Sequence, residues 1–126
     1  MEFFSKINTS IEGSEFLKNA LTISSLPSFT DSILNVISDS GDTGEIYSIW
    51  GQFDISRELI RYGVRFSLTS CPLAFAWTIT LNPDQNEVIA HSTFNKTDAD
   101  PEFVETIVSF MSEWELSIDD LCKQHS

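Results

Sequence analysis

The chain has few basic residues. Seven lysines and arginines stand against nineteen aspartates and glutamates, which gives a formal net charge of −12 and an isoelectric point near 4.2. Proteins bind nucleic-acid phosphates and anionic lipid surfaces through clusters of lysine and arginine. The shortage of cations therefore argues against nucleic-acid binding through phosphate contacts and against membrane association. The negative charge favours a basic protein as partner, or serves only to keep the chain soluble.

Cysteine is also scarce, with only Cys71 and Cys122. The N-terminal residues lack the basic region and following apolar stretch of a secretory signal. No segment approaches the ~20 apolar residues of a membrane-spanning helix. We therefore expect a cytoplasmic protein whose two thiols stay reduced.

Glycine and histidine are too few to build a common cofactor site. The five glycines are scattered, so the chain has no glycine-rich loop to hold phosphates. Zinc generally takes four ligands, and Cys71, His91, Cys122 and His125 are the only cysteines and histidines. We therefore expect no metal and no other cofactor. No Ser-His-Asp order accompanies His91, so no catalytic residue is assigned and the sequence leans against an enzyme.

The apolar residues are sufficient for one globular domain. The chain has 126 residues, of which 41% are hydrophobic, and it contains ten phenylalanines. A chain of this length buries roughly two thirds of its unfolded surface. We predict that residues 1–126 form a single α+β domain.

Residues 1–40 are predicted to be helical. Phe4, Ile7 and Ile11 recur at helical spacing, and Ser14 is a suitable N-cap for a second helix. Pro27 interrupts the second pattern, so a third, short helix is expected to follow it.

Apolar and polar residues alternate between residues 45 and 95, as in strands with one buried face. The alternation falls into four runs, at 47–55, 60–69, 73–81 and 88–95. Short connections between such runs predict a four-stranded antiparallel meander.

Residues 100–122 are predicted to form a C-terminal helix. Asp100 is a suitable N-cap, and Pro101 suits the first helical position. The predicted fold is a four-stranded sheet with one face covered by the N- and C-terminal helices. In its core, Phe66 and Trp77 would pack against an apolar stripe of the helix. The stripe comprises Phe103, Ile107, Phe110, Met111 and Trp114.

The opposite face of the predicted sheet is the first candidate site. Trp50, Arg61, Arg65 and His91 are predicted to point outward there, among small residues such as Thr78. Tryptophan and arginine are enriched at the energetic centres of protein interfaces. The face could contact a partner protein or a second copy of the chain, or it could be an ordinary solvated surface.

The acidic side of the C-terminal helix is the second candidate. Residues 98–126 hold eight acids against a single lysine. Such a surface could bind a basic patch on a partner protein and speed association with that protein, or it could simply be solvated. The predicted partner-binding acids are Glu105, Glu113, Glu115, Asp119 and Asp120.

Architecture and charge together suggest a non-catalytic, acidic protein-binding module. In these two respects the chain resembles bacterial immunity proteins, which neutralise a toxin, and this resemblance implies a basic partner. An alternative resemblance, to the acidic dimeric chaperones of type III secretion, implies a homodimer formed through the sheet. A further alternative is a small-ligand-binding protein or an enzyme that uses the sheet face around Trp50, Arg65 and His91.

Overall fold

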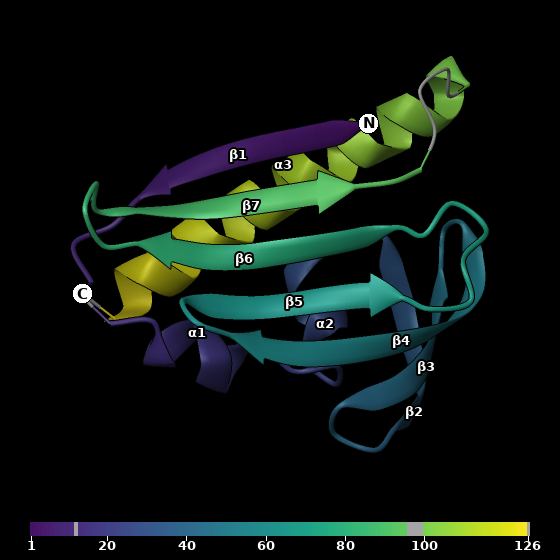
Figure 1. Cartoon of the computed structure of the whole chain (residues 1–126), viewed down its shortest axis with the longest axis horizontal. Helices are drawn as coiled ribbons and strands as arrows, with labels where there is room; N and C mark the ends of the chain where they lie inside the picture. The colour runs from purple at the N-terminus through teal and green to yellow at the C-terminus, as the bar shows by residue number, and fades with distance from the viewer. Residues whose placement is uncertain (12, 96–99, 126) are drawn as a thin grey trace.

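The computed structural model describes residues 1–11, 13–95 and 100–125. They form a seven-stranded antiparallel sheet, three helices and connecting turns (Figure 1). In chain order the elements are β1 (Glu2–Asn8), α1 (Glu15–Ala20), α2 (Leu26–Phe29), β2 (Ile33–Asp39), β3 (Thr43–Ser48), β4 (Gly51–Ile60), β5 (Gly63–Leu68), β6 (Ala76–Asn82), β7 (Glu87–Thr93) and α3 (Pro101–His125). The spatial order of the strands is β1-β7-β6-β5-β4-β3-β2.

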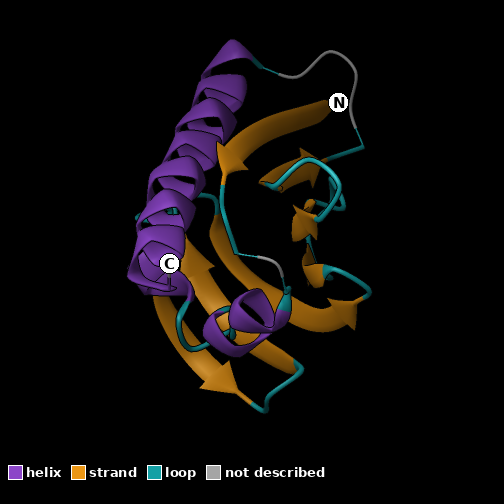
Figure 2. Ribbon diagram, turned by 90° about the vertical axis from the view of Figure 1, so that its left-hand side faces the viewer, coloured by secondary structure: helices purple, strands orange, loops and turns teal. Residues whose placement is uncertain are grey.

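The sheet curves around the long helix α3, which lies against its concave face (Figure 2). Strands β2 to β7 follow one another as antiparallel neighbours, and β1 pairs with β7 at the far edge. The helix contacts β1 and β7, while α2 packs against both α3 and β2. Among the described residues, none of the helices is long and apolar enough to cross a membrane.

Aromatic side chains fill the space between the sheet and α3. Trp77 and Phe66 are fully buried, and their ring centroids lie 5.4 Å apart. Phe110 of α3 meets the face of Trp77 edge-on at 5.1 Å, a favoured arrangement for aromatic pairs. The predicted packing against the helix is therefore confirmed for Trp77 and Phe110; Ile107 is buried in the same core, whereas Phe103 is only partly buried.

The C-terminal helix begins where the sequence predicts. Pro101 is its first residue, and the Asp100 carboxylate accepts a hydrogen bond of 2.9 Å from the backbone N–H of Glu102. Asp100 thus satisfies one of the free N–H groups at the helix start. The helix continues to His125, three residues beyond the predicted end.

The prediction of a helical N-terminal region and a four-stranded sheet is wrong. Glu2–Asn8 and Ile33–Asp39 are strands, and the sheet has seven strands. Phe4 and Ile7 matched a helical spacing, yet they lie on opposite faces of β1, with exposed fractions of 60% and 4%. The pairing of β1 with β7 decides the structure, because short segments follow their tertiary neighbours rather than local periodicity.

The sequence did not reveal strand β2 because its pairing with β3 is irregular. Its register with β3 shifts between Ile33 and Asn35 and again between Val36 and Ser38. Each shift breaks the alternation of the two faces. As an edge strand it leaves Leu34 and Ile37 exposed, so the sequence shows no clean period of two.

The predicted strand over 47–55 is two strands joined by a tight turn. The chain reverses at Ile49 and Trp50, between β3 and β4. Gly51 takes a φ of +124° after this turn, a conformation that residues with a side chain rarely adopt. The alternation of apolar and polar residues could not reveal that the chain reverses here, because the same pattern continues on both sides of the turn.

Candidate functional site

An apolar pocket of about 300 Å³ opens at one end of the sheet. Its walls come from the β3–β4 turn, the β5–β6 loop, the adjoining strands and the first turn of α3. The lining residues are Trp50, Phe53, Leu68, Cys71, Pro72, Leu73, Phe75 and Phe103. We refer to this hollow as the Trp50 pocket.

Trp50 joins the sheet to the helix. Its indole Nε1–H donates a 2.9 Å hydrogen bond to Oγ1 of Thr106, whose own hydroxyl donates to the carbonyl of Phe103. The indole lies 5.4 Å from the ring of Phe75 and 6.5 Å from that of Phe103, measured between centroids. These contacts fix one wall of the pocket.

The loop between β5 and β6 forms the opposite wall. Two backbone hydrogen bonds close it locally, from the N–H of Cys71 to the carbonyl of Leu68 and from the N–H of Ala74 to the carbonyl of Cys71. A third, of 2.7 Å, runs from the N–H of Asn95 to the carbonyl of Leu73 and ties the loop to the segment after β7. Ala74 has a φ of +50°, so the loop turns sharply before Phe75 enters the core.

The lining of the Trp50 pocket is carbon-rich and uncharged. Four of its eight side chains are aromatic, and the Cys71 thiol is partly exposed. The Trp50 N–H is already satisfied by Thr106. Such a surface can bury an apolar molecule, but it offers few hydrogen bonds to a sugar or a nucleotide.

The structure separates the predicted outward-facing residues. Arg65 and His91 do lie on the outer face of the sheet, on either side of Thr78 in the strand register. Trp50 does not join them, because its indole turns to the inner side and packs on Phe75 and Phe110. Predicting Trp50 on the outer face was wrong, since that prediction treated the β3–β4 turn as strand.

His91 and the two arginines have different surroundings. The His91 ring stacks on Phe4 with centroids 4.3 Å apart, and its Nε2 lies 3.2 Å from a carboxylate oxygen of Glu2. The Nε–H of Arg65 donates to Oγ of Ser67 at 3.3 Å. Arg61 lies in the β4–β5 turn, where its guanidinium sits 5.1 Å above the ring of the next residue. A role for these residues in binding a partner or a second copy stays a prediction.

The acidic residues of α3 do not form one free surface. The Glu113 carboxylate accepts hydrogen bonds from Oγ1 of Thr30 at 2.6 Å and from Oγ of Ser32 at 2.7 Å. It therefore holds α3 to the segment that precedes β2. Asp119 pairs with Lys123 at 2.9 Å. The remaining predicted acids, Glu105, Glu115 and Asp120, are exposed.

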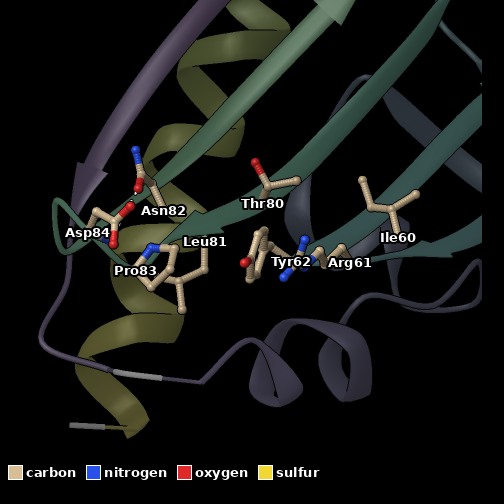
Figure 3. Close-up of a pocket in the computed structure, with 8 residues that line it drawn as sticks. All are labelled: Ile60, Arg61, Tyr62, Thr80, Leu81, Asn82, Pro83 and Asp84. Carbon is tan, nitrogen blue, oxygen red and sulfur yellow. Dashed lines mark hydrogen bonds between the residues drawn. The ribbon is translucent and has the colours of Figure 1, made fainter.

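A second hollow, of about 480 Å³, lies at the opposite end of the sheet (Figure 3). The β4–β5 turn supplies Arg61 and Tyr62, and the β6–β7 turn supplies Pro83 and Asp84. Figure 3 shows the lining side chains in a row that runs from Ile60 to Asp84. We favour the Trp50 pocket as the site, because apolar side chains from three separate elements line it.

Most of the Trp50 pocket was missed by sequence reasoning. Trp50 was singled out for another face, and the aromatic residues around it were assigned to the core. Trp50 and Leu73 lie in turns, where small and polar residues predominate, so nothing in the sequence placed these two residues in turns or marked the pocket between them.

The fold is similar to that of solved bacterial proteins. XoxI from Bacillus cereus superposes with a TM-score of 0.59 at 17% identity, over 96% of each chain. An uncharacterized protein from Bacillus thuringiensis gives 0.58 at 17% identity, over 93% of this chain and 96% of that one. A START superfamily protein from Mycobacterium smegmatis gives 0.60 at 8% identity, over 100% and 98%. No protein-family model matches the sequence, and a search of curated proteins also gave no match.

The architecture is therefore START-like: a seven-stranded antiparallel sheet with a long C-terminal helix. This result corrects the expected resemblance to immunity proteins and secretion chaperones. It also overturns the hypothesis of an acidic protein-binding module. That hypothesis counted Trp50 and Glu113 among the partner-binding residues, whereas Trp50 faces inward and Glu113 is bonded within the fold.

Proposed function

We propose that the protein binds a small hydrophobic molecule in the Trp50 pocket. The observation that carries this proposal is an apolar pocket lined by the rings of Trp50, Phe75 and Phe103, which three separate elements supply. Ligand sites are typically concave and apolar, with volumes from about 300 Å³ upward. The Trp50 pocket, at about 300 Å³, is at the small end of this range, which suits a molecule with up to three aromatic rings.

The fold supports the same proposal. START-like proteins are typically hydrophobic small-ligand-binding proteins, although a shared fold does not specify a ligand. Of the functions weighed from the sequence, small-ligand binding is the alternative that agrees with this fold. The proposed binding site, however, lies on the inner side of the sheet at Trp50 and not on the outer face.

Burial of apolar surface would provide most of the affinity. The indole N–H of Trp50 and the hydroxyl of Thr106 are engaged with protein atoms, so the ligand needs few polar groups. A ligand that buries about 200 Å² of apolar surface gains about 5 kcal/mol before the costs of association. We also infer a cytoplasmic location, which the two unpaired thiols support.

The test is binding of N-phenyl-naphthylamine, an uncharged dye whose fluorescence rises in apolar surroundings. We expect saturable binding to the native protein and a loss of affinity of about tenfold in Leu73→Trp, because the larger side chain fills the pocket. Leu116→Trp is the matched control, since Leu116 is exposed on α3. Equal binding by both variants, or no binding by the native protein, would exclude the pocket as the site.

A further inference from the structure

We infer that the Trp50 pocket selects apolar ligands with a positive charge, such as protonated aromatic amines, over apolar carboxylates and other anions. This inference rests on the proposed function, because it specifies the chemical class of the ligand that the same pocket would hold. Four features of the surroundings support it: the positions of the basic residues, the capped and acidic start of α3, the nearby carboxylates and the aromatic walls.

None of the described basic residues lines the pocket. Binding sites for amphiphilic anions generally provide an arginine or a lysine to pair with the charged head group. Here the guanidinium of Arg57 donates to the carbonyls of Leu21 and Lys18 beside α1. The others lie on the outer face, in the β4–β5 turn or along other elements; they are Lys6, Lys18, Arg61, Arg65 and Lys123.

The start of α3 does not offer an anion site. A helix N-terminus attracts anions through its free N–H groups and its dipole. In this chain the carboxylate of Asp100 already accepts from the N–H of Glu102, and Glu102 itself adds a negative charge in the first turn. An anionic head group near Phe103 would therefore meet two carboxylates.

Further carboxylates lie on the segments that supply the lining. Asp54 follows Phe53 in β4, so its exposed carboxylate is on the opposite face of the sheet, and its backbone bonds to Thr69 and Ser70. Glu105 lies one turn beyond Glu102 on α3, and both are exposed. With the whole chain at −12, this end of the molecule raises the local concentration of cations and lowers that of anions.

The walls themselves can contact a cation favourably. Ammonium groups are attracted to the faces of aromatic rings, most strongly to that of tryptophan. The Trp50 ring is tilted by 40° to Phe75 and by 48° to Phe103, so the three rings are turned at different angles around the apolar space. An apolar amine can thus bury its ring and keep its charge beside aromatic faces or the flanking carboxylates.

The experiment measures competition for N-phenyl-naphthylamine by three compounds that share a phenyl ring and four methylenes: 4-phenylbutylamine, 4-phenylbutanol and 5-phenylpentanoate. At neutral pH their head groups are cationic, uncharged and anionic, so the apolar part is the same in all three. We expect the amine to bind most tightly and the carboxylate most weakly, with about a tenfold difference between them at low salt. The difference should shrink as salt is added.

A pair of variants assigns the preference to the pocket. Glu102→Gln with Glu105→Gln should reduce the ratio of amine to carboxylate affinity by about threefold, because it removes two negative charges from the start of α3, on either side of Phe103 in the sequence. The control, Glu15→Gln with Asp84→Asn, makes the same change in net charge away from the pocket, on α1 and in the β6–β7 turn (Figure 1), and should leave the ratio unchanged.

The outcomes separate this inference from the proposed function. If the dye binds but the carboxylate competes as well as the amine, the charge preference is wrong and the hydrophobic site stands. The same conclusion follows if both double variants change the ratio equally. If neither the dye nor any of the three compounds binds the native protein, the proposed function fails and the charge preference fails with it.

Discussion

Trp50 connects three parts of the molecule. Its indole bonds to Thr106 of α3, its ring packs on Phe75 of the β5–β6 loop, and its backbone N–H bonds to the hydroxyl of Ser48. A residue in a tight turn thereby sets the spacing between the sheet and the start of the helix. Its neighbours determine both the stability and the shape of the pocket.

The hydrogen bond between Trp50 and Thr106 should be measurable as stability. In Thr106→Val the shape of the side chain is kept, but the partly buried indole N–H loses its acceptor. We expect the free energy of unfolding to fall by about 1–2 kcal/mol. Urea unfolding measures this loss. Thr106→Ser is the control because it keeps the hydroxyl, and a loss as large as that of the valine variant would contradict this assignment.

The two thiols should differ in reactivity. Cys71 is partly exposed at the Trp50 pocket, whereas Cys122 is buried on α3 and its burial raises the pKa of its thiol. Because the thiolate is the reactive form, N-ethylmaleimide should modify Cys71 well before Cys122. Bound N-phenyl-naphthylamine should slow the first reaction. Mass spectrometry of the modified peptides identifies the site, and preferential labelling of Cys122 would contradict the predicted order.

At the level of elements, the sequence revealed segments that carry a local pattern. It did not reveal a strand whose pairing partner lies far along the chain. Strands β5 to β7 have one apolar and one polar face, so alternation reveals them, and the Asp100 cap reveals the start of α3. Strand β1 has its partner in β7, far along the chain, so no local pattern specifies it. The turn at Trp50 has apolar residues in place of the usual small and polar ones, so the sequence predicted a continuous strand over 47–55 and the site was missed.

Glu113 shows how an acidic residue on a helix surface can have a structural role. Its carboxylate accepts from the hydroxyls of Thr30 and Ser32, both buried, and holds α3 to the segment before β2. Glu113→Ala should lower the free energy of unfolding by about 2 kcal/mol, because two buried hydroxyls lose a charged partner. Chemical denaturation provides the measurement. Glu115→Ala, at an exposed position on the same helix, should change stability by less than about 0.5 kcal/mol.

A smaller difference between these two variants would mean that the hydroxyls of Thr30 and Ser32 find other partners. In that case Glu113 would resemble the exposed acids of α3. The acidic residues of α3 would then form one continuous exposed surface.

At the scale of the whole molecule, one curved sheet and one long helix enclose a single aromatic core. Phe110 occupies its centre, in contact with Trp77, Phe75 and Trp114. The Trp50 pocket is where this core reaches the surface, because Phe75 belongs to both. Composition and charge could indicate a globular acidic protein, but only the assembled fold brings these distant aromatic residues together.

Removing the central ring should destabilise the whole fold. Phe110→Ala leaves a cavity between the helix and the sheet and should cost about 3–5 kcal/mol. Calorimetry or denaturant unfolding measures the loss, and Val108→Ala, at an exposed position of α3, is the control. A loss below about 1 kcal/mol would show that the helix does not pack as the structure describes.

Titration of the isotope-labelled protein with N-phenyl-naphthylamine, followed by NMR, tests whether this pocket binds apolar molecules. The three tryptophans give separate indole N–H signals, and Trp50 alone lies at the pocket, since Trp77 and Trp114 are fully buried. We expect the largest shifts at the Trp50 indole and at the backbone amides of Cys71, Leu73 and Phe103. Shifts confined to Arg65 and His91 on the outer face, or no shifts at all, would contradict the binding site proposed for this protein.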